Sequence, residues 1–171
     1  MRPLRIYLQK MSGGTSLPAH ASFFHIFLAG VGAGLAIAIG VYLEEALHFN
    51  ILMAPLGASC FLAFAIPDSP LAQPRNIVLG HMISSCAALF VLQFFGYGAL
   101  QIALAVALAV MAMLATRTSH APAAATPLVI FALQPTWDYL VAPVLPGALV
   151  VALTALIFNN LRPSVRYPQY W

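Results

Sequence analysis

The segment Ala54-Pro55-Leu56-Gly57-Ala58-Ser59 decides the fold, because a related segment, Ala121-Pro122-Ala123-Ala124-Ala125-Thr126, returns 67 positions later, from residue 54 to residue 121. Each copy predicts a helix that begins at a proline, since the first helical turn has no use for the N–H group that proline lacks. The small residues behind each proline leave backbone N–H groups open to a ligand. The two copies therefore predict a pair of related helix starts.

The composition around these segments indicates a membrane protein. Of 171 residues, 62% are hydrophobic and 6% are charged, against about 25% charged in soluble domains. The basic residues are too sparse for a nucleic-acid surface, and most lie near the chain ends, where they are typical of membrane-flanking anchors. Cys60 and Cys86 lack the spacing of a disulfide framework or a metal site, so we expect buried free thiols, no metal and no cofactor.

Six apolar segments follow one another along the chain. We expect them at about residues 23–43, 55–66, 76–95, 100–115, 122–133 and 139–158. They form one transmembrane domain, residues 22–159, between a loose cytoplasmic tail at residues 1–21 and a second cytoplasmic tail at residues 160–171. The first segment has a face of small residues that suits close helix packing in lipid, made up of Gly30, Gly34, Ala36, Ala38 and Gly40.

The two proline-started segments are too short to span a bilayer alone. A hydrocarbon core of ~30 Å requires about 20 helical residues, whereas residues 55–66 give roughly 18 Å at ~1.5 Å each. An extended lead-in at ~3.3 Å per residue, over residues 48–54, makes up the distance. Thr118-Ser119-His120 supplies the matching approach to the second copy. Each copy is therefore predicted to be a half-helix with an extended lead-in.

The arginine positions favour six crossings over two re-entrant hairpins. With a cytoplasmic N-terminus and six crossings, Arg75, Arg117, Arg162 and Arg166 all fall on the inner side, in agreement with the positive-inside bias. Three segments per repeat is an odd number, so the second repeat, residues 96–159, runs inverted to the first, residues 22–95. The predicted fold is an all-α polytopic 3+3 inverted repeat, as in secondary transporters, with the two helix starts meeting near the midplane.

Opposed helix starts predict a site for a small anion. A helix N-terminus carries about half a positive charge and unpaired N–H donors, so two of them bind an anion without a buried lysine or arginine. The hydroxyls of Ser59 and Thr126 either donate to the anion or bond the carbonyl one turn back. The candidate binding residues are Pro55, Gly57, Ala58 and Ser59 in the first copy and His120, Pro122, Ala124, Ala125 and Thr126 in the second.

Further polar residues lie beside these segments. His120 directly precedes the second proline helix, and it is a candidate anion donor or proton carrier, the alternative being a histidine that caps or packs. For Asp68 and Arg75 we expect a mutual ion pair that ties the proline-rich turn between them, the alternative being that they line an inner vestibule. The candidates for gating or for the inner vestibule are Asp68, Gln73, Arg75, His81 and Arg117.

One stretch resembles a known family. Pro67-Asp68-Ser69-Pro70-Leu71-Ala72-Gln73-Pro74-Arg75-Asn76, followed by Gly80-His81, resembles the hallmark of the HPP family of integral membrane proteins, and His120-Ala121-Pro122 resembles its name-giving motif. The likeness covers about residues 26–158. The chain departs from the family pattern at Ala121, where the motif has a proline, and at Ala123-Ala124, where glycines are often found. The resemblance implies four spanning helices, against the six that the arginines favour.

The resemblance also implies a function, since plastid and cyanobacterial members are associated with nitrite transport. We expect a transporter or channel of the bacterial inner membrane for a small monovalent anion, nitrite first, with both termini cytoplasmic and several copies in a homo-oligomer. The alternative is a non-catalytic membrane scaffold or sensor subunit. An intramembrane enzyme would use Ser59 or Ser69 with His81 or His120, but the sequence has no nucleophile motif, so we do not expect an enzyme.

Overall fold

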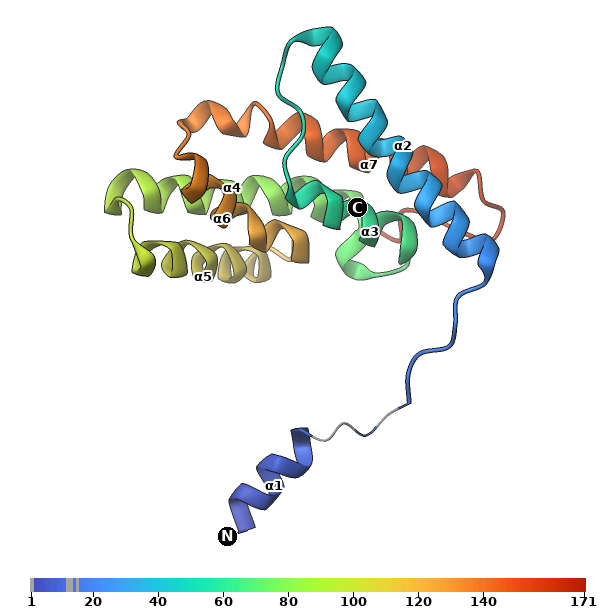
Figure 1. Ribbon diagram of the computed structural model, residues 1–171, viewed down its shortest axis with the longest axis horizontal. Coiled ribbons are helices and arrows are strands. Elements are labelled where there is room, and N and C mark those ends of the chain that lie inside the picture. Colours follow the sequence, from blue (N-terminus) through green and yellow to red (C-terminus); the bar gives the residue numbers. More distant parts are fainter. Residues whose placement is uncertain (1, 12–13, 15) are drawn as a thin grey trace.

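The computed structural model describes residues 2–11, 14 and 16–171, with side chains described from residue 6 onward. All regular structure in this part of the chain is helical, as predicted. The α-helices are α1 (Arg2–Met11), α2 (Phe23–Leu47), α3 (Pro55–Ala65), α4 (Pro74–Phe95), α5 (Ala99–Ala115), α6 (Thr126–Leu133) and α7 (Val144–Asn160), and the 3₁₀ turns are η1 (Pro70–Ala72), η2 (Ala121–Ala125) and η3 (Trp137–Leu140). The helix α4 lies between α5 and α7, and α1 stands apart from the bundle (Figure 1).

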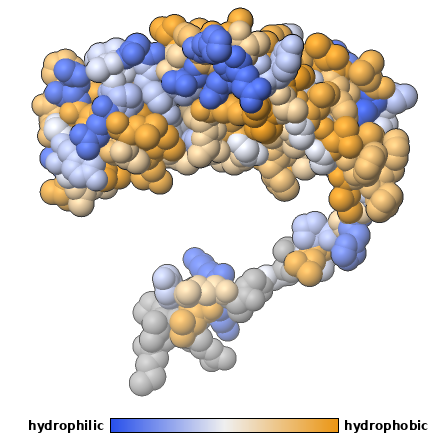
Figure 2. All heavy atoms as spheres, turned by 45° about the horizontal axis from the view of Figure 1, so that its top comes forward, coloured by the Kyte–Doolittle hydropathy of each residue, from blue (hydrophilic) through white to orange (hydrophobic). Residues whose placement is uncertain are grey.

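The outer surface of the bundle is that of a membrane protein. Three helices are long and apolar enough to cross a membrane, namely α2, α4 and the continuous stretch Trp137–Asn160, while α3, α5 and Ala121–Leu133 are shorter apolar helices. Hydrophobic residues cover much of the face in Figure 2, and hydrophilic residues gather in separate patches. The chain therefore contains transmembrane helices, and the count of six crossings stays a prediction.

The first predicted half-helix is confirmed, and the second differs at its start. The helix α3 begins at Pro55 and ends at Ala65. The second copy begins as the 3₁₀ turn η2 and becomes α-helical only at Thr126. The reason is a second proline, Pro127, which has no N–H group to continue an α-helical ladder back into η2. The two prolines are therefore connected by a 3₁₀ turn, a form of helix that occurs mainly in short pieces.

The extended lead-in to α3 is held from two sides. The carboxylate of Glu44, near the end of α2, accepts hydrogen bonds from the backbone N–H groups of Ile51 and Leu52, at 3.0 Å each. On the other side the lead-in lies directly against α7, because a Cβ atom built on Gly147 would come within 2.2 Å of the Ile51 carbonyl oxygen. The backbone can pass this close only where the helix carries a glycine.

The small-residue face of α2 is not the one the sequence suggested. A Cβ at Gly30 or Gly34 would meet nothing within 4 Å, whereas one at Gly32 would lie 2.4 Å from Phe64 Cδ1. The buried stripe is Gly32, Ala36 and Gly40, so only the last two of the predicted face take part. Successive positions four apart share one helix face, and the bulky Phe64 of α3 selects the stripe that can admit it.

Three further expectations need correction. The leader is not wholly loose, since Arg2–Met11 forms the helix α1. The last segment does not begin as one α-helix near Tyr139, because η3 comes first and Pro143, without an N–H group, separates it from α7. Cys60 is a buried free thiol as expected, but Cys86 is exposed, because it is turned away from the buried side of α4 by about 100° from Ser85 and about 140° from His81.

Candidate functional site

Four polar side chains form one buried chain of hydrogen bonds at the centre of the bundle. Ser59 Oγ lies 2.9 Å from His81 Nε2 and 2.8 Å from His120 Nε2. His81 Nδ1 lies 3.1 Å from Thr126 Oγ1, and the two imidazole rings meet edge to face with centroids 5.1 Å apart. None of the four residues is more than 1% exposed. We call this set, Ser59, His81, His120 and Thr126, the histidine chain.

The histidine chain joins the two proline-started segments. Ser59 comes from the first turns of α3, Thr126 is the first residue of α6, and His81 lies between them on the buried face of α4. His120 belongs to the extended lead-in of η2, with φ −139° and ψ 103°. His120 can approach α4 because residue 80 is a glycine. A Cβ atom built on Gly80 would lie only 2.8 Å from the Cβ atom of His120.

The direction of every hydrogen bond in the neutral chain follows from one carbonyl group. His120 Nδ1 is 2.7 Å from the Leu71 carbonyl oxygen, which can only accept, so Nδ1 carries the single proton of a neutral imidazole. His120 Nε2 must then accept from the Ser59 hydroxyl, whose oxygen accepts from His81 Nε2–H in turn. His81 Nδ1 is left to accept from the Thr126 hydroxyl. Each neutral group is satisfied in one orientation only.

Sequence reasoning missed three groups around this chain. The Leu71 carbonyl fixes its direction, and Ser84 Oγ donates to the Ala123 carbonyl of η2 at 2.6 Å. Ser85 Oγ, also buried, has no hydrogen-bond partner among the described residues. The two serines carried a usable signal, because polar side chains within a membrane helix tend to be functional or paired. A backbone carbonyl carries none.

Several backbone donors at the helix starts already have partners. The N–H groups of Leu56 and Gly57 donate to the carbonyls of Met53 and Ala54, at 3.0 and 3.2 Å, and Ala123 N–H donates to the His120 carbonyl at 3.0 Å. Of the predicted binding residues, Pro55, Ser59, His120, Pro122 and Thr126 are buried, Ala124 is half-buried, and Gly57, Ala58 and Ala125 are exposed. The structure therefore brings together the polar members and turns three of the small ones outward.

The predicted ion pair between Asp68 and Arg75 is wrong. Arg75 Nη1 and Nη2 donate to the carbonyl oxygens of Arg117 and Thr116, at 2.6 and 3.3 Å, while Asp68 accepts from Gln169 Nε2 at 3.0 Å. The carbonyls at the end of α5 are left without helical partners and attract a cation. Arg75 therefore caps the C-terminal end of α5. Arg117 itself is exposed, and its backbone φ is 55°.

The proline-rich turn between Asp68 and Arg75 is tied to the C-terminal segment. Gln73 is fully buried, donates to the carbonyls of Pro67 and Ser69, and accepts from Gln169 N–H at 2.7 Å. Tyr167 donates to the Ala72 carbonyl at 2.5 Å and is 2% exposed. Gln73 is therefore a structural tie in this conformation, and residues 161–171 do not form a free tail.

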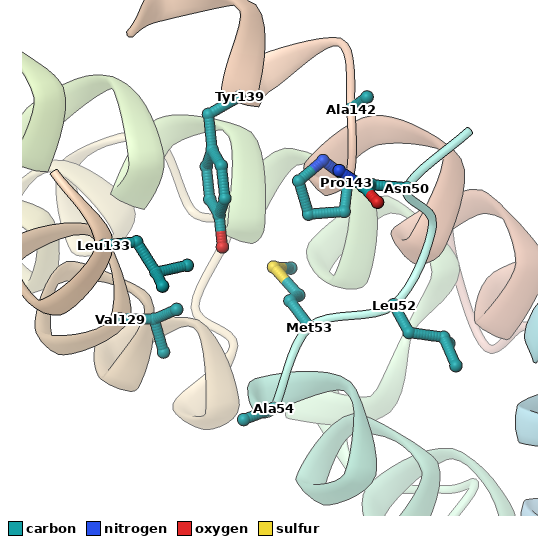
Figure 3. Close-up of a pocket in the computed structure, with 9 residues that line it drawn as sticks. All are labelled: Asn50, Leu52, Met53, Ala54, Val129, Leu133, Tyr139, Ala142 and Pro143. Carbon is teal, nitrogen blue, oxygen red and sulfur yellow. The ribbon is translucent and has the colours of Figure 1, made fainter. Parts of the chain in front are cut away.

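A pocket of about 340 Å³ opens beside the start of α3. It lies between the lead-in, represented by Met53 and Ala54, and the α6 residues Val129 and Leu133 (Figure 3). The hydroxyl of Tyr139 points into it. Within the described residues no group of three or more His, Cys, Asp or Glu side chains could hold a metal ion. The lining of this pocket is mainly apolar, and none of the four residues of the histidine chain belongs to it.

Comparison with known proteins identifies the family. Residues 18–168 match the family model described as HPP, transmembrane region, so the chain belongs to the HPP family of transmembrane proteins. It is 35% identical to one protein of Dictyostelium discoideum described as a transmembrane protein, over 96% of this chain and 57% of the relative, and 34% identical to another, over 81% and 52%. The chain thus spans about half the length of these relatives. No solved structure matches it.

Proposed function

We propose that this protein is a membrane transporter or channel for a small monovalent anion, nitrite first among the candidates. One observation carries the proposal: two discontinuous helices begin beside one another, and their first turns share a buried chain of two hydroxyls and two imidazoles. Helix starts and neutral N–H or O–H donors inside an apolar bundle are the groups that bind anions at membrane depth. Membership of the HPP family is consistent with such a role.

The packing supports an inverted repeat. Gly147 of α7 lies against the Ile51 carbonyl in the lead-in to α3, and Gly80 of α4 lies against the Thr118 carbonyl in the lead-in to η2, with a built Cβ at 2.2 and 3.1 Å. Gly80 and Gly147 are 67 positions apart, and so are Ile51 and Thr118. The third helix of each proposed repeat thus touches the lead-in of the other, which is what a two-fold relation between inverted repeats would produce.

The proposed six-crossing arrangement gives the site two routes. In it both termini are cytoplasmic in a bacterial inner membrane, residues 48–54 cross the outer half of the membrane as the extended lead-in, and the turn at residues 134–138 lies outside, so the pocket beside Ala54 faces the outer side. The proline-rich turn lies inside. There the Leu71 carbonyl ends the histidine chain, with Leu71 half-buried and Pro70 exposed. An anion entering by the outer pocket would reach the helix starts before it met the inner turn.

The hydroxyl and imidazole contacts do not favour an enzyme. Ser59 is 0% exposed, and His120 turns its second nitrogen to a carbonyl, whereas a serine nucleophile needs substrate access and commonly a carboxylate behind its histidine. In the described part of the chain no carboxylate is hydrogen-bonded to either imidazole. A scaffold or sensor subunit, the other alternative, would have no use for a buried polar chain that is costly to desolvate.

The decisive experiment is anion flux through purified, full-length protein in liposomes. We expect saturable uptake of nitrite, tested beside nitrate, formate and chloride, with protein-free liposomes to remove passive leak. The nitrite recovered from inside the vesicles should be chemically unchanged. A scaffold would give no flux with any of the four anions, and an enzyme would alter the anion or another substrate without moving it.

Anion affinity should depend on the two hydroxyls. Ser59→Ala or Thr126→Val removes one neutral donor from the site, and a hydrogen bond to a charged partner contributes about 1.5–3 kcal/mol, which is roughly tenfold or more in affinity. Nitrite-dependent thermal stabilisation measures this loss, with Ser85→Ala as the matched hydroxyl deletion. If both variants bound nitrite as the parent does, the hydroxyls would have to be removed from the site.

A further inference from the structure

We propose that the histidine chain carries one transferable proton, so that the anion crosses together with a proton. This inference rests on the proposed anion transport and adds its coupling ion. The chain is suited to the task because it is continuous: four successive hydrogen bonds of 2.7–3.1 Å run from Thr126 through His81, Ser59 and His120 to the Leu71 carbonyl.

The chain has room for one proton more than its neutral form. Besides its two imidazole contacts, Ser59 Oγ lies 3.3 Å from the Pro55 carbonyl oxygen. If His120 binds a proton on Nε2, both imidazoles donate to Ser59 Oγ, and the Ser59 hydroxyl turns to the Pro55 carbonyl instead. Every polar hydrogen still has an acceptor, because one hydroxyl rotation replaces the lost bond. No heavy atom needs to move between the two states.

The transfer balances along the chain. A proton that binds His81 Nδ1 displaces the hydrogen bond from Thr126 and makes His81 an imidazolium. His81 Nε2 then gives its proton to Ser59 Oγ while Ser59 gives its own to His120 Nε2, which leaves His81 neutral and His120 cationic. Once the anion is released, the proton leaves by the same steps in reverse, which restores the starting tautomers. One proton binds with the anion and one leaves with it, and every hydrogen bond of the histidine chain ends in its starting direction.

The extra proton supplies the positive charge that a buried anion needs in this site. Helices α5, α6 and α7 contain no titratable side chain, and α3 contains only Cys60. An anion held among them without a countercharge would be an expensive buried charge. A proton on the histidine chain makes the loaded site neutral overall, whereas the helix starts alone offer partial charges, several of them already satisfied by backbone carbonyls.

No other charged group takes over this role. Around the two histidines, α4 also carries Arg75 and Cys86, and the neighbouring turns and C-terminal segment carry further titratable groups: Asp68, Tyr97, Arg117, Asp138, Tyr139, Arg162, Arg166, Tyr167 and Tyr170. None of these described groups is hydrogen-bonded to either imidazole. Arg75 is occupied at the end of α5 and Asp68 at Gln169. The two imidazoles are therefore the groups that can change charge within the chain itself.

Coupling is tested by recording proton movement and membrane potential during nitrite uptake. Full-length protein is placed in liposomes that contain a pH-sensitive dye, with a potential-sensitive dye outside. We expect internal acidification by one proton per nitrite, little change in potential, and faster uptake when the outside is more acidic. Protein-free liposomes correct for passive nitrous acid. Uptake by the wild-type protein that builds a potential without acidification would overturn the proposal.

Substitutions then assign the proton to this chain. His81→Gln and His120→Gln keep an amide in place of each ring but cannot bind the proton, so protein-dependent acidification should fall at least tenfold. The matched control is His20→Gln, an exposed histidine outside the bundle, which should leave it unchanged. Full acidification by the His120→Gln variant would contradict the proposal. The absence of acidification by the wild-type protein would also contradict it.

A spectroscopic arm separates this inference from the proposed function. Nitrogen NMR of ¹⁵N-histidine-labelled protein in bilayers should give opposite neutral tautomers, with the proton on Nδ1 of His120 and on Nε2 of His81, assigned by the two glutamine variants. The same tautomer on both rings would overturn the chain. Absence of flux for every anion refutes the proposed transport and its coupling, whereas flux with matching tautomers on the rings refutes the proton chain alone.

Discussion

At the residue scale, the hydrogen bonds of the histidine chain depend on which atom of each hydroxyl or imidazole carries the proton. His120 reaches an acceptor that cannot donate, and this single contact orients Ser59, His81 and Thr126. Because each group in the neutral chain has one satisfied orientation, the loss of one hydroxyl leaves a specific nitrogen without a partner. Buried unsatisfied groups cost about 1–3 kcal/mol each.

Adjacent serines on α4 offer a matched pair of predictions. Ser84→Ala removes the bond to the Ala123 carbonyl, so we expect a loss of about 1 kcal/mol, or roughly 2–4 °C in melting temperature. Ser85→Ala removes a buried hydroxyl without a partner among the described residues, so stability should be unchanged or higher. Thermal unfolding in detergent measures both. A Ser85→Ala protein as unstable as Ser84→Ala would indicate that Ser85 has an acceptor after all.

At the element scale, helices meet non-helical backbone at two glycines. Gly147 and Gly80 let the lead-ins to α3 and η2 pass directly against α7 and α4. The lead-in to α3 is also held by hydrogen bonds to the Glu44 carboxylate, which restrict its movement away from α7. The position of each half-helix start therefore depends on the absence of one methyl group from a neighbouring helix.

Gly147→Ala tests this dependence. Its Cβ would lie 2.2 Å from the Ile51 carbonyl oxygen and 2.5 Å from Leu56 Cδ1, and such overpacking typically costs about 1–3 kcal/mol. The matched control is Gly30→Ala, whose Cβ meets nothing within 4 Å and which should gain about 0.5–1 kcal/mol as a helix-interior glycine replaced by alanine. Equal melting temperatures for the two variants would contradict the close approach.

At the scale of the whole molecule, the C-terminal segment is bonded to the proline-rich turn at one end of the bundle. Tyr167, Gln169 and Tyr170 all bond to the proline-rich turn, which in turn holds the carbonyl that ends the histidine chain. Burial raises the pKa of the Tyr167 phenol, because the charged form is disfavoured away from water. Its folded-state pKa therefore lies above its unfolded value.

The consequence is a loss of stability in alkali. Below the unfolded tyrosine pKa, about 10, both states hold the proton and the contribution of Tyr167 is complete. As the pH rises further, the unfolded state loses the proton first, so the native state becomes progressively less stable. We expect Tyr167→Phe to cost about 1 kcal/mol near neutral pH but to flatten this alkaline decline. Thermal unfolding followed from pH 8 upward would show no such difference if the phenol were solvated.

The membrane class and the half-helix at Pro55 could be predicted because they depend on local chemistry. An apolar run and a proline at a helix start have the same meaning wherever the chain goes. The four polar members of the histidine chain were also predicted as candidates, because hydroxyl and imidazole groups are rare in apolar helices. The exact start of the second half-helix was missed, since the effect of Pro127 depends on a competition between two turn types.

Other features depend on distance in space and were decided by the tertiary structure. The sequence suggested Asp68 as the partner of Arg75, but the unpaired carbonyls of α5 are closer and take the guanidinium. It suggested Gly30 and Gly34 as the packing face of α2, but Phe64 selects Gly32. By itself the sequence determined an all-helical membrane protein with two proline-started segments, because these follow from hydropathy and backbone chemistry. Only the fold decided that Ser59, His81, His120 and Thr126 share their protons, because hydrogen bonds require atoms within about 3 Å.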